Sequence, residues 1–294
     1  MVEPVETWLA DVVDAIDTQA QARYDAVAAV AHDVVVGLDF DGTLAPIVED
    51  PAAAWIHPDG PAVLTALAGR VRALAIVTGR PARQVVELGR LHEVADKLPA
   101  GARLLVRGQY GNELWDSAAR TFHSPDVPAG LAAFIDELPG LLEREGVADA
   151  FVEEKGLAVA VHTRRLADPA AAFARLEPRL GGAASRHGLG LEPGRFVLEV
   201  RAPGMHKGQA LLEVVAECDA GGVLFVGDDL GDLDAFEAAR SLREHSLPVL
   251  LVCSGSVEQQ ALAAVSDLVV DGPVGVLALL RRLTADATGA GPAH

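Results

Sequence analysis

Two aspartates separated by a single residue follow an apolar run in the first sixth of the chain. The run Val34–Leu38 is typical of a buried strand, and Asp39 and Asp41 come directly after it. Side chains two positions apart on an extended backbone point the same way, so both carboxylates leave the strand end on one side. Gly42 then permits a tight turn. Such a pair can hold a hard cation and leave one oxygen free to attack an electrophile.

Three further segments place polar groups beside predicted elements. In chain order they supply Thr78, Gly79 and Arg80 after a second apolar run, Lys207 at a predicted helix start, and Asp228, Asp229 and Asp232 after a third apolar run. Each has an ordinary explanation, as a turn residue, a solvated lysine or an acidic helix start. Lysine is scarce in this chain, with Lys97, Lys155 and Lys207 the only examples, which favours a function for a lysine placed beside a motif.

The order Asp-x-Asp, Thr, Lys, Asp-Asp resembles the four motifs of the haloacid dehalogenase-like phosphatase superfamily. The resemblance implies an α/β fold with a Rossmann-like parallel-sheet core and an inserted α+β cap domain. It also implies that Asp39 is a nucleophile forming an aspartyl-phosphate, and that Asp41 is the general acid for the leaving oxygen and then the base for water.

The same resemblance assigns the remaining groups around the phosphoryl transfer. It implies Mg²⁺ bound by Asp39, the Asp41 carbonyl and Asp228. Thr78 and Lys207 are expected to hold the non-bridging oxygens, with backbone N–H groups near Gly42 and Gly79 assisting and Arg80 among the substrate-binding residues. Asp229 and Asp232 are expected to position either the magnesium waters or Lys207.

Composition limits the partners. The chain has 294 residues, half of them apolar, and a formal charge of -18. Such a charge argues against nucleic acid and anionic membranes as partners, and it requires local positive charge around an anionic substrate. Cys218 and Cys253 suggest neither a disulfide framework nor a cysteine zinc site. The acidic N-terminus is unlike a secretory leader, so we expect a cytoplasmic protein. We also expect a monomer or weak oligomer, and the resemblance to phosphatases implies a small-molecule sugar phosphate as the substrate.

The hydrophobic pattern divides the chain. Strand and helix patterns alternate early and late, as in a parallel sheet with crossover helices, whereas the middle reads as an antiparallel sheet with helices. We therefore expect an N-terminal helical lead-in at 1–32, a discontinuous catalytic core at 33–108 and 204–283, a cap domain at 109–203 and a flexible tail at 284–294.

The middle segment carries a closer resemblance. Gly108-Gln109-Tyr110-Gly111-Asn112-Glu113, Glu153-Glu154-Lys155-Gly156, His162-Thr163-Arg164 and Glu199-Val200-Arg201 resemble motifs of trehalose-6-phosphate phosphatases. The resemblance implies that Glu153, Lys155 and Glu199 bind sugar hydroxyls, which carboxylates and ammonium groups do well. The same residues could instead form cross-strand charge pairs on a sheet face.

The last motif differs from the family pattern at two positions. The family usually continues Gly-Asp-Asp-x-Thr-Asp-Glu, but Gly231 and Leu233 stand here in place of Thr and Glu. These changes could alter metal preference or rate. Two rival functions stay open: a phosphatase or phosphotransferase for another sugar phosphate, such as sucrose or glucosyl- or mannosyl-glycerate phosphate, and a non-catalytic sugar-phosphate sensor. Retention of both Asp39 and Asp41 argues against the sensor, because a sensor needs no nucleophile.

Overall fold

A computed structural model describes residues 18–48, 50–194, 196–204, 206–255 and 260–287. The chain forms two compact units, one of residues 1–123 with 206–294 and the other of residues 124–205. No helix in these described ranges is both long and apolar enough to cross a bilayer.

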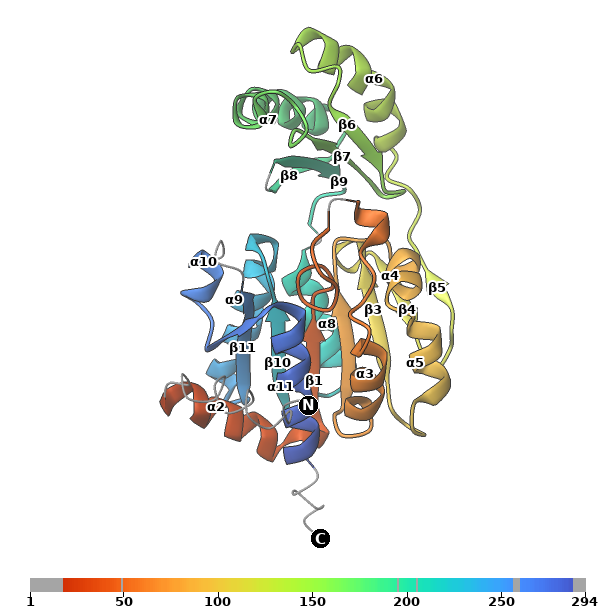
Figure 1. Cartoon of the computed structure of the whole chain (residues 1–294). Helices are drawn as coiled ribbons and strands as arrows, with labels where there is room; N and C mark the ends of the chain where they lie inside the picture. The colour runs from red at the N-terminus through yellow and green to blue at the C-terminus, as the bar shows by residue number, and fades with distance from the viewer. Residues whose placement is uncertain (1–17, 49, 195, 205, 256–259, 288–294) are drawn as a thin grey trace, which may run out of the picture. The chain divides into compact units, whose positions relative to one another are not determined.

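The larger unit contains an eight-stranded sheet in the order β12-β11-β10-β1-β2-β3-β4-β5 (Figure 1). Its strands are β1 (Val34–Leu38), β2 (Ala73–Val77), β3 (Leu104–Gly108), β4 (Glu113–Asp116), β5 (Phe122–His123), β10 (Gly222–Gly227), β11 (Val249–Gly255) and β12 (Leu268–Asp271). The six strands from β12 to β3 run parallel. Leu38 of β1 pairs with Val226 of β10 on one side and Ile76 of β2 on the other, so strand order reverses at β1. Open α/β sheets bind ligands at the carboxyl ends of the strands beside such a reversal.

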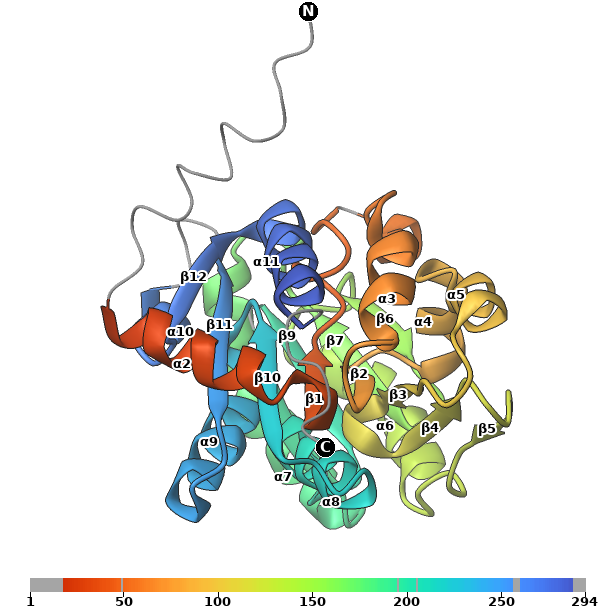
Figure 2. The same ribbon diagram turned by 90° about the horizontal axis from the view of Figure 1, so that it is seen from below.

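Alternate residues of each buried strand pack into two apolar layers. The helices of the larger unit are α2 (Thr18–Ala29), α3 (Gly60–Ala68), α4 (Ala82–Leu88), α5 (Leu91–Lys97), α8 (Lys207–Glu217), α9 (Leu233–Ser241), α10 (Gln260–Ala263) and α11 (Gly272–Asp286). Val36 and Leu38 face the layer that contains α3 and α11, whereas Val35 faces the layer that contains α8 and α9. Figure 2 shows α3 and α11 on one side of the sheet and α8 and α9 on the other. Both faces are therefore covered, which explains why the central strands read as continuous apolar runs.

The smaller unit is an α+β domain. Its antiparallel sheet has the order β6-β7-β9-β8, built from β6 (Phe151–Glu154), β7 (Ala158–His162), β8 (Gly190–Gly194) and β9 (Val197–Arg201), with the helices α6 (Leu131–Arg144) and α7 (Pro169–Arg186). Val159, Val161, Leu198 and Val200 pack with both helices in one apolar cluster. Side chains alternate across a sheet, so both helices cover one face and the charged residues lie on the other.

One predicted boundary is wrong. We expected residues 109–123 in the cap, but β4 and β5 extend the larger sheet, with β4 antiparallel to β3. Trp115 of β4 is fully buried in the main core and packs against Phe122 of β5, with ring centroids 6.4 Å apart. Short antiparallel strands look alike in sequence whichever sheet they join, so this pairing depends on the turn at Gln109–Gly111, which sends the chain back beside β3.

The two ends of the chain differ from the expected segments in separate ways. The predicted N-terminal helix is present as α2 from Thr18 to Ala29, and its expected first part, residues 1–17, lies outside the described residues. The predicted flexible tail begins too early, because α11 continues through Asp286 and buries Leu280 and Leu283. Residues 288–294 of that tail also lie outside the described residues.

A glycine in β1 allows the close packing that holds this strand against α8. A Cβ atom on Gly37 would lie 2.7 Å from Cδ2 of Phe225 and 3.0 Å from Cδ1 of Leu211. We predict that Gly37→Ala lowers the free energy of unfolding by about 1–3 kcal/mol, because the extra methyl group overpacks a rigid core. Urea unfolding measures this change, and Gly182→Ala in α7 is a contrasting variant, because a Cβ there meets nothing within 4 Å and the residue has no positive φ. Unchanged stability of Gly37→Ala would contradict the packing argument.

Candidate active site

A buried lysine lies between two carboxylates at the carboxyl edge of the larger sheet. The Nζ atom of Lys207 is 2.8 Å from Oδ1 of Asp39 and 2.8 Å from Oδ1 of Asp232. Asp39 follows β1, Lys207 begins α8, and Asp232 ends the short 3-10 helix η4 (Leu230–Asp232). All three side chains are buried. Charges removed from water to this degree are tolerated only when they are paired and hydrogen-bonded, as they are here.

Asp232 also organises the chain after β10. Its Oδ2 atom accepts the N–H groups of Asp228 at 2.9 Å and Asp229 at 3.3 Å. A carboxylate oxygen from each of Asp39, Asp228 and Asp232 lies within 4.8 Å of the other two. The sheet thus brings together Asp39 and Asp228, which the sequence predicted as metal ligands, and adds Asp232. Hard oxygen donors at this spacing fit a divalent cation such as Mg²⁺.

Burial and neighbouring carboxylates raise the pKa values of Asp39 and Asp228 in this site. Burial raises the pKa of Asp39 to about 8; Lys207 opposes this shift, and Asp232 adds to it. Burial, with the neighbouring Asp39 and Asp229, raises the pKa of Asp228 to about 9. Burial lowers the pKa of Lys207, but Asp232 and Asp39 more than reverse this, so its pKa lies well above the ordinary value. One ammonium therefore does not balance the carboxylates, and a bound cation would let the protonated acids ionise.

The turn after Asp41 lies directly against the metal-site residues. Gly42 has a φ of +67°, and a Cβ atom there would lie 2.1 Å from Oδ2 of Asp228. Only glycine fits both conditions. The buried Ser254 hydroxyl, at the end of β11, donates to the Gly42 carbonyl at 2.6 Å. Sequence reasoning missed Ser254, although a hydroxyl at the end of a neighbouring parallel strand was a usable signal.

The turn after β2 contributes Thr78 and Arg80. Thr78 is buried, and its Oγ1 atom accepts the Arg80 N–H at 3.2 Å. The Arg80 guanidinium grips Asp41 with two bonds, from Nε to Oδ2 at 2.6 Å and from Nη2 to Oδ1 at 2.7 Å. It also donates to the Pro51 carbonyl at 2.8 Å. We expected Arg80 among the substrate-binding residues, but the structure directs its side chain onto Asp41 in a bidentate pair.

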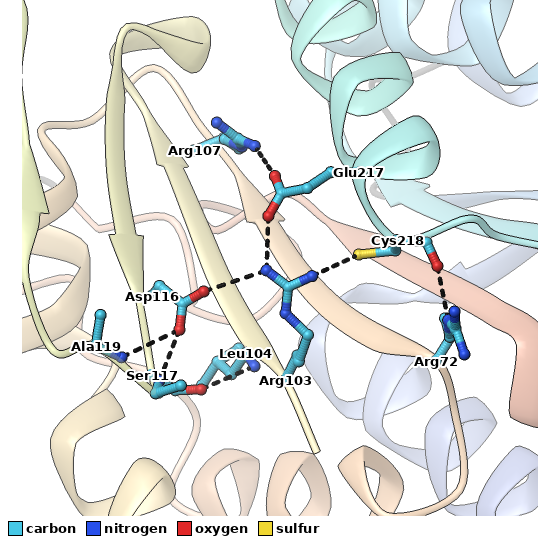
Figure 3. Close-up of polar contacts among 10 residues, drawn as sticks. Arg72, Arg103, Leu104, Arg107, Asp116, Ser117, Ala119, Glu217 and Cys218 are labelled. Carbon is cyan, nitrogen blue, oxygen red and sulfur yellow. Dashed lines mark hydrogen bonds and ion pairs between the residues drawn. The ribbon is translucent and has the colours of Figure 1, made fainter. Parts of the chain in front are cut away.

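The far end of α8 is fastened to the sheet, which fixes the direction of Lys207. Figure 3 shows Glu217 between two arginines: its carboxylate oxygens lie 2.6 Å from Arg103 and 2.5 Å from Arg107. Arg103 also contacts Asp116 of β4 at 3.2 Å. The ion pairs of Glu217 hold the C-terminal end of α8, and the contacts of Lys207 hold its N-terminal end.

In the smaller unit, the three predicted sugar-binding residues lie on the sheet face opposite the helices. Lys155 Nζ is 2.6 Å from Oε2 of Glu199, and His162 Nε2 is 3.0 Å from Oε2 of Glu153. Ala160 pairs with both Glu153 and Glu199, so the two glutamates lie in one row across the sheet. Arg201, which we did not single out, lies 3.7 Å from Oε1 of Glu199. These contacts are cross-strand pairs, and a ligand that binds the same groups must compete with them.

The fold is that of a haloacid dehalogenase-like hydrolase. A hydrolase of this class from Bacteroides thetaiotaomicron aligns with a TM-score of 0.58 and 14% identity, over 84% of this chain and 98% of that one. The C-terminal domain of C. albicans trehalose-6-phosphate phosphatase aligns with a TM-score of 0.72 and 19% identity, over 92% of this chain and 98% of that domain.

The chain belongs to the trehalose-phosphatase family, whose model matches residues 37–95 and 143–270. The trehalose-phosphate phosphatase of Mycobacterium tuberculosis is 31% identical over 236 residues, which are 76% of this chain and 54% of that protein. An uncharacterized glycosyl hydrolase of the same species is 36% identical over 219 residues, 70% of this chain and 15% of that protein. The chain thus spans about half the length of the curated phosphatases that it matches.

The raised pKa values of Asp39 and Asp228 predict that the effect of Mg²⁺ on stability depends on pH. Asp39 and Asp228 have pKa values of about 8 and 9 when folded, against 3.8 ordinarily, so the folded state binds protons more tightly than the unfolded state. Without divalent cation, the stability from these groups is present at low pH and is lost as pH rises through their folded pKa values. We predict that Mg²⁺ raises the melting temperature more at pH 8 than at pH 5.

Differential scanning calorimetry with and without Mg²⁺ at both pH values measures this difference. Asp228→Asn is the matched control, because it removes one titrating ligand and should shrink the difference. An equal effect of Mg²⁺ at both pH values would contradict this account of the site.

Proposed function

We propose that this chain hydrolyses trehalose 6-phosphate to trehalose and inorganic phosphate, the last step of trehalose biosynthesis, with Mg²⁺ as cofactor. The observation that carries the proposal is the convergence of Asp39, Lys207 and Asp228 at one sheet edge, with Lys207 Nζ 2.8 Å from Asp39. Membership of the trehalose-phosphatase family supports the substrate.

The reaction proceeds in two displacements at phosphorus. A carboxylate oxygen of Asp39 attacks the phosphorus, the bond from phosphorus to the sugar oxygen breaks, and that oxygen takes a proton from Asp41. Water then attacks the phosphorus of the aspartyl-phosphate while Asp41 accepts a water proton. Cleavage of the bond from phosphorus to Asp39 releases inorganic phosphate and restores the carboxylate.

The remaining residues of the site offset charge and orient the phosphoryl group. Lys207 offsets the negative charge beside Asp39, and the Thr78 hydroxyl with the Gly79 N–H binds non-bridging oxygens. Asp232 holds Lys207 and the backbone after Asp228. Asp39 and Asp228, with the Asp41 carbonyl, are the residues that would hold Mg²⁺. When bound, this ion would supply positive charge that offsets the repulsion between the attacking carboxylate and the phosphoryl group.

Arg80 positions Asp41 in this scheme. Its two bonds to the Asp41 carboxylate hold that side chain beside the turn that also carries Thr78. Both carboxylate oxygens of Asp41 thus accept hydrogen bonds from one guanidinium, which fixes the orientation of the side chain. For proton donation to the leaving sugar, Asp41 must exchange this contact for one with the substrate.

The smaller unit supplies the sugar specificity. Glu153, Lys155 and Glu199 present two carboxylates and an ammonium on the sheet face without helices, a suitable donor and acceptor set for sugar hydroxyls. Glu199 keeps one buried carboxylate oxygen, Oε1, without a hydrogen bond, and a sugar hydroxyl would satisfy it. This oxygen is a specific reason to favour a polyhydroxylated substrate.

A panel of phosphate esters separates the proposal from its rivals. We predict that kcat/KM is highest for trehalose 6-phosphate, compared with glucose 6-phosphate, sucrose 6-phosphate and glucosylglycerate phosphate. Asp39→Asn should lower kcat by about a thousandfold or more, because the nucleophile is lost. A preference for another sugar phosphate would overturn the substrate assignment. Tight binding of a sugar phosphate without turnover of any ester would favour the sensor.

A second prediction concerns sugar recognition alone. We predict that Glu199→Gln raises KM for trehalose 6-phosphate by about ten- to a hundredfold, because a buried charged acceptor is lost. Turnover of p-nitrophenyl phosphate, which has no sugar, should change less than about twofold. Glu143→Gln, an exposed carboxylate on α6, is the matched control. Equal losses on both substrates would show that Glu199 does not recognise sugar.

A further inference from the structure

The segment between β3 and β4 has an unusual backbone. Gln109, Tyr110 and Gly111 have φ values of 49°, 58° and 105°, three left-handed residues in succession. The first two carry side chains, and such residues cost roughly 1–2 kcal/mol each in this region. The sequence resemblance drew attention to residues 108–113, where Tyr110 could either contact the sugar or serve in packing. The strain must be offset by contacts that the segment makes.

Two of these contacts reach the turn after β2. The Gln109 N–H donates to the Arg80 carbonyl at 2.9 Å, and the Tyr110 N–H donates to the Thr78 carbonyl at 2.9 Å. Two consecutive left-handed residues aim successive N–H groups in the same direction, which a regular strand cannot do. The unusual backbone therefore serves to hold this particular turn from behind.

Two side chains complete the support. The Tyr110 ring lies on Gly79, so that a Cβ atom on Gly79 would come within 2.7 Å of both Cζ and Oη of the tyrosine. Oε2 of Glu113 accepts the Ala82 N–H at 2.6 Å, where α4 begins. The turn is thus fixed at its start by backbone bonds, at its middle by the ring and at its end by the carboxylate.

The supported turn keeps its own groups available on the other side. Thr78 Oγ1 accepts the Arg80 N–H, which leaves the hydroxyl hydrogen to be donated elsewhere. Among the described residues, no acceptor takes the N–H of Gly79. A hydroxyl and a backbone N–H that are both rigid and available to donate make a site for an anion.

We infer that Tyr110 and Glu113 are positioning residues for the phosphate-binding turn Thr78–Gly79. The inference rests on the proposed function, because it assigns this turn to the non-bridging phosphoryl oxygens. In this role Tyr110 sets where the Gly79 N–H lies, and Glu113 sets where α4 starts. A loose turn would weaken the phosphoryl contacts of Thr78 and Gly79, whatever the sugar.

Phosphate affinity tests this role without requiring turnover. Titration calorimetry with inorganic phosphate and saturating Mg²⁺ compares the whole chain with Tyr110→Asn, which tolerates the left-handed backbone, and with Glu113→Ala, which removes the acceptor of the Ala82 N–H. We expect the dissociation constant for phosphate to rise about ten- to a hundredfold in both variants. The Mg²⁺ half-saturation should stay within about twofold, because Asp39 and Asp228 are untouched. Tyr110→Phe, which keeps the ring on Gly79, should restore most of the affinity.

Asp168→Ala is the matched control. The Asp168 carboxylate accepts the Ala171 N–H at the start of α7, as Glu113 does for α4, so Asp168→Ala loses the same kind of contact in the other unit. Asp168→Ala should leave phosphate affinity unchanged. Wild-type affinity in Tyr110→Asn and Glu113→Ala, with lowered melting temperatures, would reduce both residues to a structural role and overturn the inference.

The outcomes also separate this inference from the proposed function. Should the wild-type chain bind phosphate and lose it in the variants, yet release none from trehalose 6-phosphate, the substrate assignment fails and the role of Tyr110 and Glu113 stands. Should the wild-type chain turn over and the variants keep their phosphate affinity, the inference alone fails. Absence of phosphate binding in the wild-type chain would overturn both.

Discussion

The contact of one ammonium with two buried carboxylates is the interaction on which this structure depends. Lys207 joins Asp39, at the end of β1, to Asp232, beside the end of β10. Removing one partner from such a group leaves an unpaired buried charge, which costs several kcal/mol. The group therefore ties two neighbouring strand ends and the first residue of α8 to one position. The same group also fixes the backbone of Asp228 and Asp229, because Asp232 accepts their N–H groups.

The sheet makes this contact possible. Strand order reverses at β1, so the ends of β10, β1 and β2 lie side by side and deliver Asp228, Asp39 and Thr78 to one edge. Two apolar layers keep these strands in register, and Glu217 fixes α8 at its far end. The excess negative charge has no counterpart among the described residues of the site beyond Lys207 and the distal Arg80. The geometry therefore favours a bound cation, without which an anionic ester would face an excess of carboxylates.

In the smaller unit the charged groups form separate pairs, in contrast to the excess of carboxylates at the edge of the larger sheet. On its sheet face without helices, Glu199 pairs with Lys155, and Glu153 pairs with His162. These pairs satisfy most of the polar groups, so a sugar that bound here, as we propose, would have to replace protein contacts with equivalent ones. Such exchange would be selective, because a ligand that lacked one hydroxyl would leave a charged group such as the buried Glu199 unsatisfied.

Much of the core site could be predicted because its chemistry is local in the sequence. Asp39, Thr78 and Asp228 each end an apolar run, and parallel strands must bring such ends together. The direction of Arg80 could not be predicted, because it depends on Asp41 being within reach in space. The Ser254 bond to Gly42 joins residues 212 positions apart, and a hydroxyl at a strand end does not reveal which group it contacts. The membership of β4 and β5 in the larger sheet was missed for a similar reason: strand pattern shows which face is buried, not which partner strand is chosen.

The left-handed backbone of Gln109 and Tyr110 also could not be predicted from the sequence. Neither residue type signals a positive φ, so the strain and the contacts that offset it became visible only in three dimensions. Sequence resemblance marked the segment, and geometry supplied its reason.

A crystal structure of the chain with Mg²⁺ and beryllium fluoride, a stand-in for the phosphoryl group, tests the central claim most directly. The account predicts one Mg²⁺ held by Asp39, Asp228 and the Asp41 carbonyl, with beryllium bonded to an Asp39 oxygen and fluorines on Lys207, Thr78 and the Gly79 N–H. Beryllium on another residue, or a metal ion that binds away from Asp39 and Asp228, would contradict it.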